Sequence, residues 1–135
     1  MKQIFVNLPV KNLQESIDFF TKLGFSFNPK FTDENATCMI IGENIFAMLL
    51  VEKFFKTFTE KEVCDTKKST EVINAIGVES KEKVDEMLEK AVSAGASEPR
   101  PPQDYGWMYG RSFQDPSGHL WEVFYMDESQ MPEKP

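Results

Sequence analysis

The chain has 135 residues, of which 41% are hydrophobic and 27% are charged, as expected for one soluble globular domain with its own core. Acidic residues outnumber basic ones by 22 to 15, and the net charge of −7 disfavours nucleic acid as a partner. No run approaches the roughly 20 apolar residues that a helix needs to cross a bilayer, so we expect no membrane-spanning helix. The start MKQIFVNLPV lacks the features of a signal peptide, so we expect a cytoplasmic protein with Cys38 and Cys64 as reduced thiols.

The first half of the chain begins with a strand and a helix. Weak alternation predicts a strand over residues 4–10. Asn12 is a good helix cap, and Glu15 stands three residues later as its capping-box partner. Apolar residues then recur at helical spacing until Gly24 ends the helix. Three short strands are predicted next, over residues 25–31, 37–41 and 45–51.

The second half repeats this order after a polar connection over residues 52–69. That connection is expected to be mobile or a short helical turn. Its Phe54, Phe55 and Phe58 could cover a cup, form a dimer contact or simply pack. A strand is predicted over residues 71–78, and Ser80 begins a helix that Gly95 ends. Extended segments follow over residues 97–103, 107–114 and 119–125, and the polar tail 127–135 is expected to fray.

The repeat predicts the architecture. Val10 and Val78 end matching strands, and Gly24 and Gly95 end matching helices. Neither half alone could bury both faces of its sheet. We therefore predict a single α+β domain over residues 1–135, with two βαβββ modules at about 1–52 and 70–126. Together they would form one curved mixed sheet around a cup, with the helices on the outer face.

The closing hairpin holds the main candidate for function. Asp115, Pro116 and Gly118 suit a type I turn between two strands rich in aromatic residues. Glu122 is the one carboxylate among five large apolar or aromatic residues in the second strand. Such a charge is costly unless it is paired, protonated or facing a water-filled cavity. Glu122 is therefore predicted to bind a ligand or to take a proton, with its pKa raised by burial. The alternative is a structural ion pair with Arg111.

The other strand of the hairpin offers further candidates. Trp107, Tyr109 and Arg111 share one face with Phe113 by alternation. If that face lines the cup, Trp107 provides a stacking wall and Arg111 an anion-binding fork. If it faces the helices, the aromatic residues belong to the core and Arg111 is strained.

Some further positions have either a role in the pocket or a purely structural one. Asn7 either lines the cup or satisfies a strand edge, and Tyr105 with Gly106 either forms a pocket rim or only a turn. His119 is expected to satisfy backbone groups at the hairpin or to pack beneath the helices.

Two segments carry a resemblance to a known family. IFVNLPVKNLQESIDFFTKLGF is similar to the opening strand and helix of the vicinal oxygen chelate superfamily, and DYGWMYGRSFQDPSGHLWEVFYMD is similar to its closing hairpin. The superfamily includes glyoxalase I, bleomycin-resistance proteins and extradiol dioxygenases. The resemblance covers nearly the whole chain and is nearest to bacterial glyoxalase-like proteins, the predicted lactoylglutathione lyases. It implies the glyoxalase fold and a homodimer.

The resemblance also implies where a metal would bind, because family enzymes hold a divalent ion inside the cup. The four ligand positions fall on Phe5, Ile73, Glu122 and, on or near, Ala47. Three of these are apolar, and a shift in register would bring in only Asn7 or Asn74, which are poor ligands for zinc, nickel or iron. His119 should point to the opposite face of the strand from Glu122. We therefore expect no metal cofactor, although the resemblance leaves a divalent ion possible.

Two functions follow from these observations. The first is a metal-free protein that binds a small organic molecule with a basic or hydrogen-bonding group. The second is a glyoxalase-type lyase or dioxygenase that acts on a small oxygenated substrate, with Glu122 as base or metal ligand. Glu122 is the predicted catalytic residue. The predicted ligand-binding residues are Phe5, Asn7, Ala47, Ile73, Trp107, Tyr109, Arg111 and Glu122.

Overall fold

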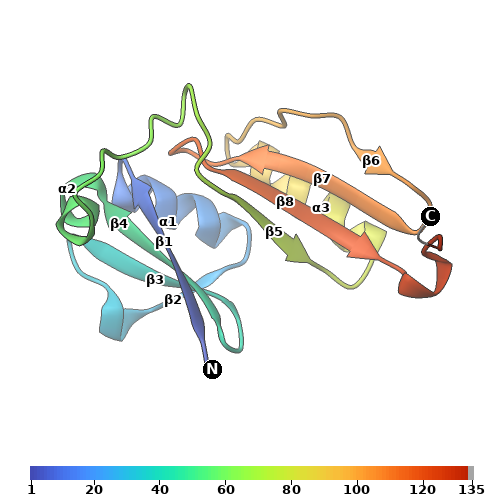
Figure 1. Ribbon diagram of the computed structural model, residues 1–135, viewed down its shortest axis with the longest axis horizontal. Helices are drawn as coiled ribbons and strands as arrows, with labels where there is room; N and C mark the ends of the chain where they lie inside the picture. The colour runs from blue at the N-terminus through green and yellow to red at the C-terminus, as the bar shows by residue number, and fades with distance from the viewer. Residues whose placement is uncertain (134–135) are drawn as a thin grey trace. The chain divides into compact units, whose positions relative to one another are not determined.

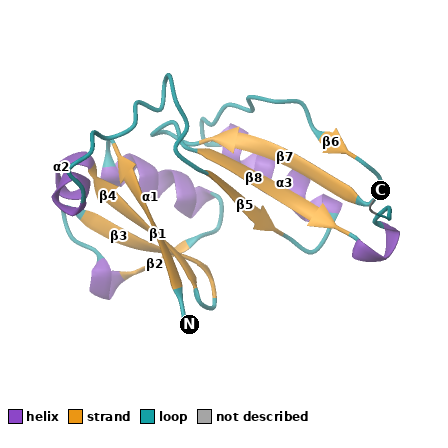
Figure 2. Cartoon of the chain, in the orientation of Figure 1, coloured by secondary structure: helices purple, strands orange, loops and turns teal. Residues whose placement is uncertain are grey.

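The computed structural model describes residues 1–133 and has two compact units, Met1–Ser69 and Thr70–Pro135 (Figure 1). Each unit has one four-stranded sheet with a helix packed on it (Figure 2). The order strand, helix and three strands occurs once in each unit, which confirms the predicted α+β fold of two βαβββ modules. The sheet is open in both units, with one sheet per unit.

The first unit follows the predicted elements closely. Its elements are β1 (Ile4–Val10), α1 (Leu13–Lys22), β2 (Ser26–Asn28), β3 (Ala36–Gly42) and β4 (Ile45–Val51). The strands lie in the order β1-β4-β3-β2, with β1 parallel to β4 and the other pairs antiparallel. Strand β2 is shorter than predicted because Asn28 caps a 3-10 turn, Pro29–Phe31, with its side chain accepting from the backbone N–H of Lys30.

The core of the first unit lies between its sheet and α1, which packs against β3 and β4. Asn12 caps α1 by accepting from the backbone N–H of Glu15. The helix buries Phe19 and Phe20. The sheet residues that are completely or almost completely buried include Leu8, Val10, Met39, Ala47 and Leu49. Because neighbouring strands are in register, these residues share one side of the sheet.

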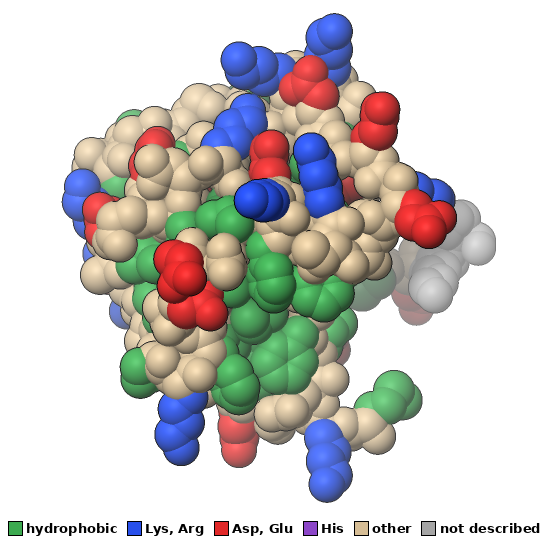
Figure 3. All heavy atoms as spheres, turned by 90° about the vertical axis from the view of Figure 1, so that its left-hand side faces the viewer, with side chains coloured by type: hydrophobic (Ala, Val, Ile, Leu, Met, Phe, Trp, Pro, Cys, Tyr) green, Lys and Arg blue, Asp and Glu red, His purple; other side chains and the backbone are tan. Residues whose placement is uncertain are grey.

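The other side of this sheet carries Phe5 and Phe46, which stack with their ring centroids 4.7 Å apart. Phe5 is exposed. Ile4 and Ile45, paired at the start of their strands, are exposed as well, but the register places them on the side of Leu8 and Ala47. Figure 3 shows hydrophobic side chains gathered between charged ones in the face that it draws.

The connection between the modules begins with two helical turns, α2 (Glu52–Phe55) and Lys56–Phe58. The rings of Phe54 and Phe58 meet edge to face, with their centroids 5.2 Å apart, and Phe58 is exposed. The short helical turn, one of the two predicted alternatives, is therefore present.

The second unit contains β5 (Ile73–Gly77), α3 (Lys81–Ser93), β6 (Gln103–Asp104), β7 (Met108–Gln114) and β8 (Leu120–Met126). Its strands lie in the order β5-β8-β7-β6, with β5 parallel to β8. The predicted strand 97–103 is mostly irregular. Ser97 makes an isolated bridge to Gln114, and regular pairing resumes only at Gln103, because Pro101 and Pro102 have no N–H to donate to a sheet.

The turn between β7 and β8 is built around a buried carboxylate. Asp115 Oδ1 accepts from the backbone N–H groups of Ser117 and His119, and Oδ2 accepts from Trp121 Nε1 at 3.0 Å. The N–H of Gly118, at a φ of 90°, donates to the carbonyl of Asp115. Desolvation by burial raises the pKa of the Asp115 carboxyl. The turn residues predicted from sequence therefore anchor the hairpin to the core through Trp121.

The tail that was expected to fray contains a 3-10 turn, Glu128–Gln130, capped by Asp127. Its last two positions, 134 and 135, lie outside the described residues. Among the helices described, none has both the length and the apolar character that crossing a membrane requires.

Candidate functional site

The register of the closing hairpin divides its side chains between two faces of the second sheet. Ser112 is opposite Glu122, Gly110 is opposite Phe124, and Met108 is opposite Met126. Paired residues in neighbouring strands point to the same side, so these six positions share one face. The alternate positions, among them Tyr109, Arg111 and Trp121, lie on the other face, against which α3 packs.

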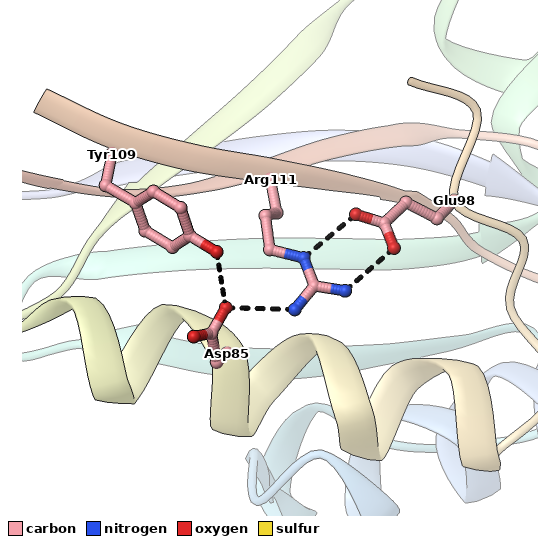
Figure 4. Close-up of polar contacts among 4 residues, drawn as sticks. All are labelled: Asp85, Glu98, Tyr109 and Arg111. Atoms are coloured by element: carbon pink, nitrogen blue, oxygen red, sulfur yellow. Dashed lines mark hydrogen bonds and ion pairs between the residues drawn. The ribbon is translucent and has the colours of Figure 1, made fainter. Parts of the chain in front are cut away.

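The helix-facing side holds a network of charged and polar side chains (Figure 4). Arg111 Nε and Nη2 donate to the two carboxylate oxygens of Glu98 at 2.9 and 2.8 Å. Its Nη1 donates to Asp85 Oδ1 of α3 at 2.9 Å, and the Tyr109 hydroxyl donates to the same oxygen at 2.6 Å. The Arg111 side chain is only 17% exposed. The network therefore ties β7 both to α3 and to the segment that leads into β6.

The pKa values in this network shift as these contacts require. The hydrogen bond from Tyr109 and the neighbouring Arg111 lower the pKa of the Asp85 carboxyl. Desolvation, followed by the bond to Asp85, raises the pKa of the Tyr109 hydroxyl. The bonds to Glu98 and Asp85 raise the pKa of Arg111 further above its ordinary value. All three groups keep their ordinary charges near neutral pH.

This network corrects two predictions. Tyr109 and Arg111 were predicted to bind a ligand if their face lined the cup, but their side chains turn toward α3, which is the other of the two alternatives. The suggested ion pair between Arg111 and Glu122 is also wrong, because the guanidinium binds Glu98 and Asp85. Arg111 is not strained on the helix-facing side, since its charge is balanced there by two carboxylates.

The opposite face of the same sheet forms a cavity of about 380 Å³. Every residue that lines it belongs to the second unit. Its apolar wall is made by Ala75, Pro101, Met108, Gly110, Phe124 and Met126. Its polar lining is made by Arg100, Gln103, Tyr105, Ser112 and Glu122, and Arg111 also contributes to the wall.

Two polar groups of the pocket that are not exposed, Glu122 and Ser112, lack a side-chain partner among residues 1–133, and so does the exposed guanidinium of Arg100. Glu122 is half-buried, and within residues 1–133 its carboxylate makes no hydrogen bond or ion pair. Ser112, its cross-strand neighbour, is 8% exposed, and its Oγ is buried with no hydrogen-bond partner among the described residues. A buried hydroxyl without a partner costs about 1–3 kcal/mol. The less exposed part of the pocket thus has unused hydrogen-bonding capacity at Ser112 and Glu122.

Gln103 and Tyr105 form part of the polar rim. The side-chain amide of Gln103 donates to the carbonyl of Pro101 at 3.1 Å and accepts from the Tyr105 hydroxyl at 3.2 Å. Gly106 takes a φ of 80° in the turn that follows. These contacts shape the segment between β6 and β7, which borders the cavity.

The other predicted ligand-binding residues lie outside this pocket. Phe5 and Ile73 are 42% and 51% exposed, and Asn7 is also exposed. Ala47 is completely buried on the α1 side of its sheet, so the prediction that it contacts a ligand in a cup is wrong. Trp107 is half-buried just before β7, and its carbonyl accepts from the N–H of Asp127.

The donor set at the four metal positions that the resemblance implies does not fit a divalent ion. Phe5, Ala47 and Ile73 have no side-chain donor atoms, which leaves Glu122 by itself. His119 is buried, and its Nδ1 lies 2.9 Å from Glu71 Oε1, away from Glu122. In the described part of the chain, no group of three or more His, Cys, Asp or Glu side chains could hold a metal ion. Glu122 alone is a weak basis for a metal site.

Sequence analysis missed Ser112, Phe124 and Met108 as pocket residues. The length of the turn could have identified Ser112, because it fixes the register of the two strands. The five residues Asp115–His119 lie between the paired positions Gln114 and Leu120, so Ser112 must be opposite Glu122 and Arg111 opposite Val123. Counting outward from this turn would have placed Arg111 on the face opposite to Glu122.

Comparison with known proteins agrees with this architecture. The model of the Glyoxalase/Bleomycin resistance protein/Dioxygenase superfamily matches residues 2–123. A search of curated proteins finds no match. Among solved structures, hypothetical protein SA1046 from S. aureus is 26% identical, with a TM-score of 0.79 over 93% of this chain and 94% of that one.

Two more distant structures share the fold. The antibiotic-binding protein TnmS3 from Streptomyces sp. CB03234 is 14% identical, with a TM-score of 0.67 over 93% of this chain and 96% of that one. Lactoylglutathione lyase from Agrobacterium tumefaciens is 12% identical, with a TM-score of 0.70 over 95% and 96% of the two chains. The family match spans nearly the whole chain and agrees with the two βαβββ modules, so this protein belongs to the Glyoxalase/Bleomycin resistance protein/Dioxygenase superfamily.

Proposed function

We propose that this protein binds a small organic molecule in the pocket of the second unit, without the divalent metal used by family enzymes. The observation that carries the proposal is Glu122, a half-buried carboxylate without a partner in the described chain. It faces a cavity of about 380 Å³ whose wall is largely apolar. An apolar pocket with a few convergent polar groups is the usual form of a small-molecule site.

The energetics favour a ligand that is mostly apolar. Burying about 200 Å² of apolar ligand surface contributes about 5 kcal/mol, at roughly 25 cal/mol per Å². The costs of association offset much of this gain. We therefore expect affinities in the micromolar to millimolar range, with the polar contact at Glu122 deciding which ligands are preferred.

The comparisons support this proposal only through the fold. TnmS3, described as an antibiotic-binding protein, has the same fold at 14% identity. This likeness supports the idea that such a scaffold can bind an organic molecule, and the choice of Glu122 rests on the pocket of this chain. The homodimer implied by the family resemblance and the cytoplasmic location belong to the proposal as well, and size-exclusion chromatography with light scattering tests the first.

A second function rests on the same carboxylate. A side chain that opens into a cavity without a partner is also placed to accept a proton from a substrate. The protein would then be a glyoxalase-type lyase or a dioxygenase, with Glu122 as base or metal ligand. Metal analysis of the purified protein, together with an assay on methylglyoxal and glutathione, separates this function from simple binding. One metal ion per chain with turnover would favour the enzyme.

The binding function is tested by screening small organic molecules for thermal stabilisation of the protein. Glu122→Gln removes the charge in the pocket while keeping the shape of the side chain. Glu43→Gln makes the same change at an exposed turn in the first unit and serves as the control. Hits should stabilise the wild type and the control but stabilise Glu122→Gln less. A library that stabilises none of the three proteins would contradict the proposal.

A further inference from the structure

We infer that the ligand of this pocket is an amphipathic amine, with its ammonium group at Glu122 and Ser112 and its apolar body against Phe124, Met108 and Met126. This inference rests on the proposed function and adds the chemical class and the orientation of the ligand. It follows from the order of polar and apolar side chains along the two central strands, from the balance of charge around the pocket, and from two glycines beside Phe124.

The polar end of the pocket suits a group with several donors. Glu122 and Ser112 are cross-strand partners, so their Cβ atoms are about 5 Å apart on the same face. An ammonium group has up to three N–H donors and no acceptor. It can donate to the carboxylate of Glu122 and to Ser112 Oγ at the same time. Because Ser112 Oγ is buried at the cavity wall, this contact requires rotation of χ1 to another staggered position.

The charges around the pocket favour a cation. The guanidinium of Arg111 is neutralised by Glu98 and Asp85 on the helix-facing side. Arg100, the other basic residue of the lining, is exposed, so water and salt screen its charge. Glu122 is the half-buried charge of the pocket lining that keeps no partner in the described residues. A carboxylate ligand at this position would be repelled by it.

The apolar end lies farther along the same two strands. Phe124 is two residues beyond Glu122 on the same face, and Met126 follows opposite Met108. Four residues of a strand span about 13 Å, so an amine carrying one aromatic ring reaches from Glu122 to the methionines. Aromatic and thioether groups pack favourably against a ring, and a ring such as that of Phe124 also attracts a cation within reach.

Glycines on both neighbouring strands make the space for such a body. Gly77 and Gly110 are the cross-strand partners of Phe124. A Cβ at Gly77 would lie 3.2 Å from Phe124 Cζ, so the ring extends over β5. A Cβ at Gly110 would meet only ordinary contacts at 3.6 Å. The ring therefore leaves the surface above Gly110 clear, and Gly110 forms part of the cavity floor.

Isothermal titration at pH 7 with 2-phenylethylamine, 2-phenylethanol and phenylacetate tests the inference on the full chain. These three molecules share a ring and differ mainly in charge. The amine should bind at least about tenfold more tightly than the alcohol, because its hydrogen bond to Glu122 joins two charged groups. The acid should bind most weakly. In Glu122→Gln the ratio of the dissociation constants of the alcohol and the amine should fall close to one. Glu43→Gln should give the same ratio as the wild type.

Equal or tighter binding of the alcohol or the acid by the wild type would overturn the inference. So would a preference for the amine that survives in folded Glu122→Gln. If only neutral or anionic compounds from a wider library perturb the amide signals of Gly110 and Phe124, the amine class is wrong but the binding function stands. If no compound of any charge binds, both proposals fail. The comparison of amine and alcohol in the wild type holds even if the variant does not fold.

Discussion

Arg111 provides a test of the reassigned face of the hairpin. Arg111→Met keeps most of the aliphatic stem but removes three charged hydrogen bonds, two to Glu98 and one to Asp85. Removing one partner of a fully buried ion pair costs about 3–5 kcal/mol. Here Glu98 is 22% exposed and Asp85 is 44% exposed. Water can therefore solvate part of the two stranded carboxylates, and we expect a loss of about 2–3 kcal/mol in the free energy of unfolding.

Arg111→Lys retains the charge but cannot satisfy both carboxylates with a planar fork, so it should cost about 1–2 kcal/mol. Lys90→Met is the control, because the exposed pair of Lys90 with Glu86 should contribute under about 0.5 kcal/mol. Both tryptophans, Trp107 and Trp121, lie in the second unit, so urea unfolding followed by tryptophan fluorescence reports on this unit. If Arg111→Met unfolded at the same urea concentration as Lys90→Met, the network would not stabilise the fold as argued.

Three further predictions follow from the pocket and the network. Gly110→Val fills the cavity floor without backbone strain, so its free energy of unfolding should stay within about 1 kcal/mol of the wild type. In isothermal titration, 2-phenylethylamine should bind to this variant at least about tenfold more weakly. Unchanged binding would place the ligand elsewhere. Ser112→Ala removes a buried hydroxyl that lacks a partner, so thermal unfolding of the ligand-free variant should show a gain in stability of about 1 kcal/mol. The variant should also bind the amine less tightly. A less stable ligand-free variant would indicate a partner for Ser112. Tyr109→Phe should cost most when Asp85 is ionised, because a lowered pKa stabilises the folded state above the unfolded pKa and that contribution is lost as the pH falls through the folded pKa. The cost in urea unfolding should therefore shrink from about pH 5 to about pH 3, and a constant cost would separate Tyr109 from that ionisation.

The fold could be predicted because its signals are local and occur twice. Asn12 and Ser80 begin the two helices, and each caps its helix by accepting a backbone N–H three residues later. Gly24 and Gly95 follow these helices with φ values of 102° and 104°, a conformation that favours glycine. The extended segment predicted over residues 97–103 pairs only at Ser97 and Gln103, because Pro101 and Pro102 between them cannot donate to a sheet.

The pocket was harder to predict because it depends on which side of the sheet the helix covers. The alternation of side chains along the strand correctly placed Arg111 on the opposite face of the sheet from its immediate neighbours. It could not show which of the two faces α3 covers. The identity of the partners of Arg111 decided the matter: Asp85 and Glu98 are 26 and 13 residues away in the chain. Glu122, which lines the pocket, could be selected from sequence because a lone carboxylate in an apolar strand stands out without knowledge of those partners.

A crystal structure of the full chain with 2-phenylethylamine would decide between this account and its alternatives. We predict the amine nitrogen within about 3 Å of a Glu122 carboxylate oxygen, with the ring over Gly110 and against Phe124. A divalent metal held by Glu122 together with other protein donors would contradict the account, as would an amine bound away from Glu122.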